Sequence, residues 1–353
     1  MDIGLFKCSL NERVLDAMKK IDNNARGTLY VVDNNDVLNG CITDGDIRRW
    51  IIKGGSVDTP VSSVMNPAPV FVYERNREEF EEILSKKKVL SIAVVDSDKH
   101  VIDVLFADRK KSYERNNSLS QTPVIIMAGG KGTRLYPYTK ILPKPLIPVG
   151  EIPIIERIMN RFSQYGVERF YISVNYRKEM IKSYFAESNK EFDIQYIEED
   201  KPLGTAGSIR LIKDNISEPV IVTNCDILIE ADYGEVLAYH KEHGNDMTIV
   251  SSLKTMVIPY GVFQSGKNGR IISMEEKPEI SNYINTGMYY INPEFIEWIP
   301  KGEPFNMTDL VSLLLHESKK VGLFPISEGS FLDIGEFAEM KKVEERIKAG
   351  LIG

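Results

Sequence analysis

A glycine-rich segment, AGGKGTR at residues 128–134, directly follows the apolar run PVIIM at 123–127. Glycines let backbone N–H groups approach phosphate oxygens closely, and Arg134 adds a permanent forked charge that suits phosphate. The spacing matches neither GxxxxGK[ST] nor GxGxxG, the two common phosphate-loop patterns. Taken alone, the glycines favour an ordinary turn after a strand. A phosphate site therefore needs further charged residues.

Lys144 is the first such residue, because it lies between Pro143 and Pro145. Proline fixes its own φ and restricts the residue before it, so the lysine is carried on a stiff segment. Stiffness is useful where a charge must already be aimed at a reacting group. The same three residues are equally typical of a surface turn of polyproline type.

Two aspartates could complete the site. Asp226 ends the apolar run PVIVTNCD at 219–226, and Asp333 lies in SFLDIGEF at 330–337. A carboxylate at the end of a parallel strand points into the crevice where α/β sheets bind ligands. Two carboxylates suit Mg²⁺, which completes its coordination with phosphates and water. Each aspartate alone could instead cap the turn or helix that follows it.

Further segments carry weaker signals. Glu276 and Lys277 precede a proline, Gly261 lies in YGVF, and Asn285 and Thr286 precede an aromatic strand. Each of these is also compatible with packing or turn chemistry.

The expected helices and strands show how such residues could meet. From residue 122, apolar strands alternate with amphipathic helices, which predicts βαβ units and a mostly parallel sheet.

The N-terminal third has a different organisation. TLYVVDNNDVLNG at 28–40 matches SIAVVDSDKHVID at 91–103, and each copy follows a helical pattern, at 9–21 and at 76–87. Two such units can bury apolar faces that one cannot. The polar stretch 109–121 is typical of a linker. We expect a tandem module at 1–115, a linker at 116–121 and an α/β domain at 122–353.

The composition is that of an ordinary soluble protein. The 353 residues are 42% hydrophobic and 27% charged, and the net charge of −7 argues against a broad nucleic-acid surface. Cys8, Cys41 and Cys225 are far apart, which predicts reduced thiols and a cytoplasmic protein. The first residues show no signal peptide, and no apolar run approaches the roughly 20 residues that cross a membrane.

The order of the motifs suggests a family. The chain contains, in sequence, GGxGTR (129–134), PKP (143–145), LGTAGS (203–208), NxD (224–226), YGV (260–262), EEKP (275–278), NTG (285–287) and DIG (333–335). Over residues 122–353 this series resembles the nucleotidyltransferases that make nucleotide-sugars from a nucleoside triphosphate and a sugar 1-phosphate. The resemblance implies a Rossmann-like, mixed and mostly parallel sheet. It also implies in-line attack of the sugar-phosphate oxygen on the α-phosphorus, with pyrophosphate as leaving group.

The resemblance also assigns roles to residues. Arg134 and Lys144 would be catalytic, and Asp226 and Asp333 would bind Mg²⁺. The nucleotide would lie against Ala128, Gly129, Gly130, Gly132, Thr133, Glu199, Gly204 and Thr205. The sugar phosphate would contact Gly261, Glu276, Lys277, Asn285 and Thr286. A carboxylate at Glu199 could accept from guanine N1–H and N2–H₂, so GTP is expected and CTP is the alternative. Glu199 could equally be a solvated member of the acidic run 198–201.

GCITDGDIRR at 40–49 resembles the signature of CBS repeats. In that family the Thr and Asp bind the ribose of adenine nucleotides, so Thr43 and Asp46 are candidates. Phe106 and Arg109 replace them in the second copy, so the module could also serve only as a scaffold or a dimerisation unit. Because CBS modules often pair, we expect a homodimer or a higher oligomer.

A CBS pair ahead of such a transferase is similar to the glucosamine-1-phosphate guanylyltransferases of bacterial legionaminic acid synthesis. Mannose and heptose 1-phosphates remain alternative acceptors. A non-catalytic, CBS-regulated sensor of nucleotide-sugars is the alternative of a different class.

Overall fold

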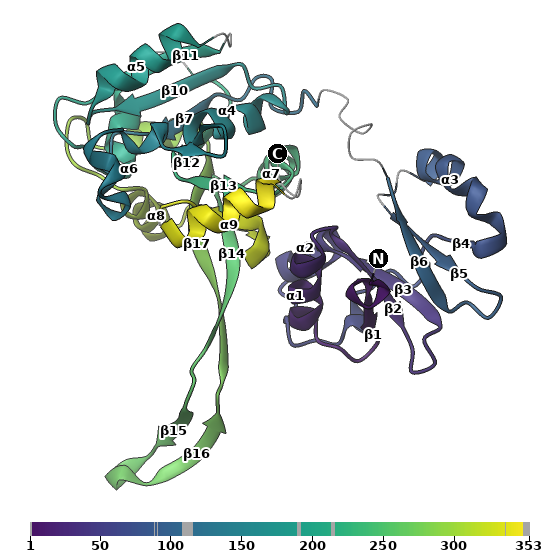
Figure 1. The fold of residues 1–353 in the computed structure, drawn as a ribbon. Helices are drawn as coiled ribbons and strands as arrows, with labels where there is room; N and C mark the ends of the chain where they lie inside the picture. Colours follow the sequence, from purple (N-terminus) through teal and green to yellow (C-terminus); the bar gives the residue numbers. More distant parts are fainter. Residues whose placement is uncertain are drawn as a thin grey trace.

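The computed structural model describes residues 2–87, 89, 91–107, 116–188, 192–212, 216–335 and 337–348. Arg109 and the rest of 108–115, within the polar stretch 109–121, lie outside these residues, whereas the expected linker 116–121 is described. Figure 1 shows an N-terminal part in purple and blue beside a larger C-terminal body in teal, green and yellow. An arm of two strands extends from the body.

The N-terminal part repeats one unit twice. The first unit has β1 (Lys7–Ser9), α1 (Val14–Asn24), β2 (Thr28–Val32), β3 (Leu38–Thr43) and α2 (Asp44–Ile52). The second has β4 (Phe71–Tyr73), α3 (Phe80–Lys87), β5 (Ser91–Val95) and β6 (Val101–Phe106). In each sheet the first two strands are parallel and the last two are antiparallel. A shared apolar cluster that includes Tyr30, Val32, Ala93 and Val95 joins the copies, so the repeat predicted from the sequence is confirmed.

The body contains a seven-stranded sheet in the order β11–β10–β7–β12–β17–β14–β18. The pairs β11–β10, β10–β7, β7–β12 and β14–β18 are parallel, whereas β17 is antiparallel to both of its neighbours. The predicted mixed, mostly parallel sheet is therefore confirmed. The strands are β7 (Val124–Met127), β10 (Arg169–Val174), β11 (Asp193–Glu198), β12 (Val220–Asn224), β14 (Met247–Val257), β17 (Glu279–Ile291) and β18 (Val321–Ile326).

Helices cover both faces of this sheet. In β7, Val124 and Ile126 belong to one buried cluster and Ile125 to another, as the alternation of side chains along a strand requires. The first cluster includes residues of α4 (Ile154–Ser163), α5 (Lys178–Glu187), α7 (Tyr233–Glu242) and α9 (Phe337–Lys348). The second includes residues of α6 (Gly204–Gly207) and α8 (Met307–His316). The result is a three-layer α/β domain.

Two short ladders stand beside the main sheet. Strand β13 (Ile227–Ile229) pairs with β19 (Phe331–Asp333), and β8 (Pro148–Val149) pairs with β9 (Ile152–Pro153). The segment 116–121 differs from its prediction as a linker. Leu119 is fully buried in the core of the body, and its N–H donates to the Tyr165 carbonyl at 2.9 Å. Leu119 therefore anchors this segment to the body, and Asn117 and Ser118 lie close to Gly166 and Gly234 beside it.

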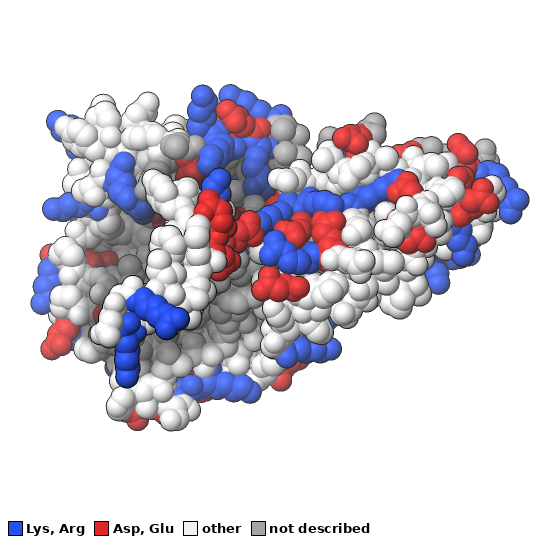
Figure 2. Space-filling model, turned by 90° about the horizontal axis from the view of Figure 1, so that it is seen from below, with Lys and Arg blue, Asp and Glu red and all other residues white. Residues whose placement is uncertain are grey.

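The outer ends of β14 and β17, with β15 (Gly261–Ser265) and β16 (Ile271–Glu276), form the arm, residues 254–283 (Figure 1). Large apolar side chains on the arm are exposed, among them Met256, Tyr260, Phe263, Ile272 and Met274. In Figure 2 the molecule is seen from below, and on this face the described acidic and basic side chains are interspersed rather than gathered by sign. No helix among the described residues is long and apolar enough to cross a membrane.

Candidate active site

The glycine loop begins where β7 ends, in the middle of the sheet. Gly132 has φ = 65°, and a Cβ there would lie 2.8 Å from the Lys144 Cβ. A Cβ on Gly129 would lie 2.9 Å from Glu199 Oε1, whereas Gly130 faces open space within 4 Å. Glycine is therefore required at 129 and 132 by close approach, and the loop remains open at 130.

Lys144 and Arg134 converge on one carboxylate. The side chains of Lys144 and Asp226 are 13% and 11% exposed and form an ion pair, with Lys144 Nζ donating to Asp226 Oδ2. Arg134 Nη2 lies 3.6 Å from the same oxygen, and its Nη1 lies 3.9 Å from Asp333 Oδ2. The four residues, each predicted from a separate motif, thus form a single charged cluster.

The β13–β19 ladder brings the two aspartates together. Ile227 pairs with Asp333 across it, and the Ile334 N–H donates to the Asp226 carbonyl at 2.8 Å. Asp333 Oδ1 accepts from the Gly335 N–H at 2.7 Å. A Cβ on Gly335 would lie 2.8 Å from Arg134 Nη2. Backbone pairing, rather than the length of the side chains, fixes the separation of the carboxylates.

Lys144 opens a short 3₁₀ turn, Lys144–Leu146, that follows Pro143 in extended conformation. The sequence predicted a stiff, extended segment, and the structure places a tight turn there instead. Pro145 in the first turn still removes conformational freedom, because its fixed φ suits that position.

Cys225, the residue before Asp226, is buried, and burial raises the pKa of its thiol to about 12.

Glu199 is buried beneath the glycine loop, which differs from a solvated surface position. Its Oε1 accepts from Ser173 Oγ at 2.5 Å, and its Oε2 accepts from the Leu203 N–H at 2.9 Å. Both carboxylate oxygens of Glu199 therefore already accept hydrogen bonds from within the protein. The carboxylate positions the 199–203 loop, and a base contact would have to use the remaining lone pairs.

Gly204 and Thr205 continue this loop. Gly204 has φ = 77°, and a Cβ there would lie 2.6 Å from the Phe305 carbonyl oxygen. Thr205 Oγ1 accepts from the Met307 N–H at 2.9 Å and so caps the start of α8. Thr133 and Arg134 belong to a 3₁₀ turn, Thr133–Leu135, directly after the glycines, and Ala128 is buried at the end of β7.

The residues expected to contact the sugar phosphate divide into two groups. Asn285 and Thr286 lie in β17, where Thr286 Oγ1 donates to the Val250 carbonyl at 2.7 Å and Asn285 donates to the Tyr289 hydroxyl at 2.7 Å. A Cβ on Gly287 would lie 2.5 Å from Asn224 Nδ2, which places this segment beside the strand that leads to Asp226.

Gly261, Glu276 and Lys277 are not brought to the cluster. They lie on the arm, where Gly261 pairs with Glu276 and the Lys277 N–H donates to the Tyr260 carbonyl at 3.3 Å. Figure 1 shows β15 and β16 at the outer end of the arm, away from β13 and α9. Strands β15 and β16 form a sheet of their own, so nothing in the ladder directs these side chains toward the aspartates.

The N-terminal candidates line a separate cavity of about 500 Å³, whose lining includes Thr43, Asp44, Asp46 and Arg48. Thr43 and Asp46 form the capping box of α2: Asp46 Oδ2 accepts from the Thr43 hydroxyl at 2.7 Å and from its N–H at 2.9 Å. They have a structural role in the absence of any ligand. Ribose binding would have to replace or share these bonds.

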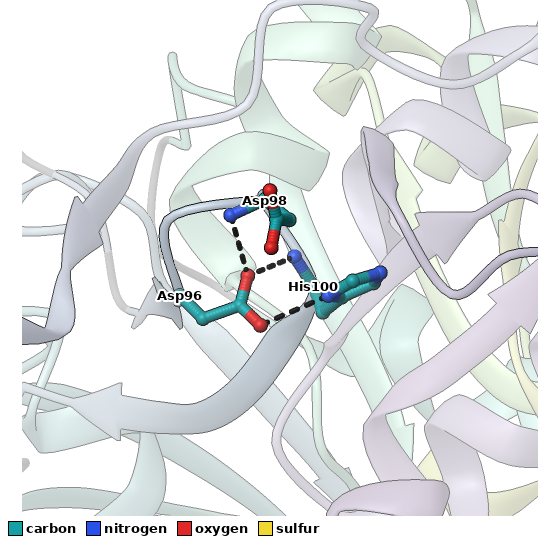
Figure 3. Close-up of side chains that lie close together, drawn as sticks. All are labelled: Asp96, Asp98 and His100. Atoms are coloured by element: carbon teal, nitrogen blue, oxygen red, sulfur yellow. Dashed lines mark hydrogen bonds and ion pairs between the residues drawn. The ribbon is translucent and has the colours of Figure 1, made fainter.

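Asp96, Asp98 and His100 are a group of side chains that could offer ligands to a metal ion (Figure 3). Asp96 accepts from the backbone of Asp98 and His100 and from the His100 ring. The hydrogen bond to His100 lowers the pKa of Asp96 and raises that of His100. In the first copy, Asp33 makes the same backbone contacts to Asn35 and Val37. The cluster is therefore explained by a repeated hairpin turn, and it lies far along the chain from Asp226 and Asp333.

Sequence reasoning missed Asp22 and Arg48, which join the two parts of the molecule. Arg48 pairs with Asp44 at 2.9 Å and with Glu235 of the body at 3.2 Å. Asp22 accepts from the Gly329 N–H at 3.0 Å. The spacing of four between Asp44 and Arg48 signals an ion pair on a helix. No local pattern signals the contacts with residues more than 180 positions away.

Comparison with known proteins agrees with this geometry. The profile of the family described as Nucleotidyl transferase matches residues 123–350, and that of the CBS domain matches residues 1–53. The chain belongs to the nucleotidyl transferase family.

A mannose-1-phosphate guanyltransferase of Saccharomyces cerevisiae is 34% identical over 221 residues, or 60% of this chain and 61% of that protein. A UTP–glucose-1-phosphate uridylyltransferase of Synechocystis is 32% identical over 202 residues, or 52% of each chain. The chain thus spans about half to three-fifths of the length of these curated relatives. The crystal structure of HddC from Yersinia pseudotuberculosis complexed with GMP-PN matches with a TM-score of 0.50 and 26% identity, covering 64% of this chain and 99% of that one.

Proposed function

We propose that this chain transfers GMP from GTP to a sugar 1-phosphate and releases pyrophosphate. The observation that carries the proposal is the convergence of Lys144 and Arg134 on Asp226, directly beside a glycine loop that is open at Gly130. Such an arrangement offers backbone amides and two cations to a polyphosphate, and it offers carboxylates to a metal ion. Family membership supports the reaction class.

The chain's own residues would act by positioning and by charge. Backbone N–H groups of 129–132 would receive the triphosphate, and the fixed cations of Arg134 and Lys144 would stabilise charge that develops in the transition state. The attacking oxygen of a sugar 1-phosphate is already anionic, so no side chain needs to remove a proton. No covalent intermediate with the protein is required.

The residues present fit Mg²⁺. Asp226 and Asp333 supply oxygen donors from two paired strands, which matches a cation that takes a few carboxylates and completes its shell with phosphates and water. When bound, Mg²⁺ would neutralise phosphate charge. Lys144 pairs with Asp226, and Arg134 lies within ion-pair distance of both aspartates. Both cations are therefore held where the phosphates would enter.

Support for guanine comes from the relatives rather than from Glu199. Guanyltransferases are among the proteins most similar in sequence, and a matched structure is complexed with GMP-PN. A uridylyltransferase is similar at 32% identity, so a base panel is needed, with CTP as the alternative expected from the sequence.

Glucosamine 1-phosphate is the proposed acceptor, for bacterial surface-glycan precursors of the legionaminic acid type. Mannose and heptose 1-phosphates are the alternatives. Further proposals are an adenine nucleotide in the cavity lined by Thr43 and Asp46, a homodimer or higher oligomer, and the domain limits 1–115 and 122–353.

The test is a matrix of GTP, CTP, UTP, dTTP and ATP against these sugar 1-phosphates, with Mg²⁺ and with pyrophosphate release as the readout. We expect the fastest release with GTP. Preference for UTP or dTTP would overturn the guanine assignment. Binding of GDP-sugar without release from any pair would favour a non-catalytic sensor.

A further inference from the structure

Several contacts join the N-terminal part to the body, among them the ion pairs of Arg13 and Lys19 with Glu279, and two others come from the consecutive segments α1 and α2. From α2, Arg48 pairs with Glu235 and lies 4.9 Å from the centre of the Phe324 ring in β18. From α1, Asp22 accepts from the Gly329 N–H at 3.0 Å. Gly329 belongs to the 3₁₀ turn Glu328–Ser330, which connects β18 to β19. The N-terminal part therefore holds the segment that leads directly to Asp333.

Asp22 fits this turn closely. The Asp22 carboxylate is largely buried against the turn, which raises its pKa, and it accepts from the Gly329 N–H in the middle of the turn. A Cβ on Gly329 would lie 2.7 Å from the carboxyl carbon of Asp22. On the other side of the turn, the Gly329 carbonyl accepts from Arg346 of α9 at 2.7 Å. Gly329 is thus held by its N–H from the N-terminal part and by its carbonyl from the C-terminal helix.

The turn is continuous with the candidate metal site. After Ser330, whose carbonyl accepts from the Glu230 N–H at 2.9 Å, the chain enters β19 and reaches Asp333 at its last residue. Ser252 Oγ of β14 also holds the residue before the turn, because it donates to the Ser327 carbonyl at 3.3 Å. A strand of three residues has little stiffness of its own, so its direction depends on how the preceding turn is held.

We propose that Asp22 is a positioning residue for the transfer reaction. By fixing the Ser327–Gly329 turn, it sets the direction of β19 and the placement of the Asp333 carboxylate beside Asp226. The N-terminal part then belongs to the architecture of the active site, in addition to any ligand it binds. This inference rests on the proposed role of Asp333. Side chains that orient metal ligands from outside the coordination shell act in this way.

The test compares Asp22→Ala with two controls. Asp22→Asn keeps an oxygen that accepts from Gly329, and Glu235→Gln removes the charge of the Arg48–Glu235 ion pair, an inter-domain contact that does not involve the turn. The readouts are Mn²⁺ affinity in the presence of GTP, measured by electron paramagnetic resonance, hydrogen exchange of residues 327–335, and the rate of pyrophosphate release.

We expect Asp22→Ala to weaken Mn²⁺ binding and to lower kcat by about tenfold each, the lower end of such outer-shell effects. Exchange at 327–335 should rise, and the KM for GTP should change less than kcat. Asp22→Asn and Glu235→Gln should remain close to wild type. Gly329→Ala, which displaces the same contact from the other side, should reproduce the Asp22→Ala effect.

Equal Mn²⁺ affinity in Asp22→Ala and wild type would overturn the proposal. Equal losses in Asp22→Ala and Glu235→Gln would also overturn it, because they would show that the contact only joins the two parts. A wild-type chain without transferase activity would contradict the proposed function instead. Mn²⁺ binding and hydrogen exchange would still decide the role of Asp22.

Discussion

The residues of the charged cluster and the site residues on the arm were predicted from motifs of the same kind, but the structure brings only the first group together. Lys144, Asp226 and Asp333 come together beside the glycine loop. Glu276 ends β16 and Lys277 directly follows it, on a two-stranded arm whose strands β15 and β16 lie away from the body (Figure 1). The β13–β19 ladder, which brings the two aspartates together, is buried in the core of the body, whereas β15 and β16 pair only with each other and carry exposed side chains.

The position of a residue at the end of a buried strand is set by the strands and helices that pack around that strand. The position of a residue on an isolated hairpin is set only by its partner strand. A two-stranded ribbon alone is marginally stable in water. The arm's exposed Phe263, Ile272 and Met274 add apolar surface that folding has not buried. The cluster should therefore tolerate little change, and the arm should act through substrate affinity.

The largest effect is expected for Lys144→Ala. Removing a pre-aimed cation from the reacting phosphates should lower kcat by about 10²–10³-fold, the range found for single groups that stabilise transition-state charge. Lys131→Ala is the matched control, because Lys131 is an exposed lysine in the same loop. Pyrophosphate release at saturating substrates measures both. A Lys144 variant within threefold of wild type would remove the cluster from the mechanism.

Arg134→Lys should have the next largest effect, a loss of about tenfold or more in kcat/KM. One guanidinium reaches toward both Asp226 and Asp333, and a lysine ammonium cannot span two partners with a planar fork. Comparison with Arg134→Ala separates charge from geometry. If the lysine variant retained full activity, charge alone would be sufficient.

Lys277→Ala tests the arm. The family resemblance requires Lys277 to hold the sugar phosphate, which in turn requires the arm to close over the site. We expect the KM for the sugar 1-phosphate to rise about tenfold while the KM for GTP stays constant, the signature of a lost ground-state contact. Lys267→Ala, in the turn between β15 and β16, is the control. Unchanged constants for both variants would mean that the arm has no part in turnover.

The smallest effect is expected for thiol chemistry at Cys225. Burial raises the pKa of this thiol to about 12, so it remains protonated, and therefore unreactive, throughout the neutral and mildly alkaline range. Activity should survive iodoacetamide at pH 8, and Cys225→Ser should match wild type within a few fold. Rapid inactivation at pH 8 that Cys225→Ser abolishes would show that the strand end is more open than the structure indicates.

These contrasts also show what the sequence can predict. The apolar run 219–224 specifies a buried strand, so the placement of Asp226 at its end followed from local pattern. The pairing of β13 with β19 joins segments about a hundred residues apart, and the sequence only suggested that Asp333 belonged with Asp226. Burial of Glu199 depended on Ser173 and Leu203, which no local pattern connects to it.

Contacts between the two parts of the chain could not be predicted at all. The bond from Gly329 to Asp22 spans 307 positions, and neither residue carries a motif. Leu119 shows the same limit on a smaller scale, because a polar stretch was expected to be a linker and one apolar side chain anchors it in the core. Local chemistry predicts strand ends and turns, whereas docking depends on shapes that form only after folding.

The most direct test of the account is pyrophosphate release from GTP, Mg²⁺ and glucosamine 1-phosphate by the wild-type chain and by Lys144→Ala, with Lys131→Ala alongside. We expect release by wild type and by the Lys131 variant, and a loss of about 10²–10³-fold for the Lys144 variant. Equal rates for all three, or no release by wild type with any nucleotide and sugar 1-phosphate in the panel, would contradict it.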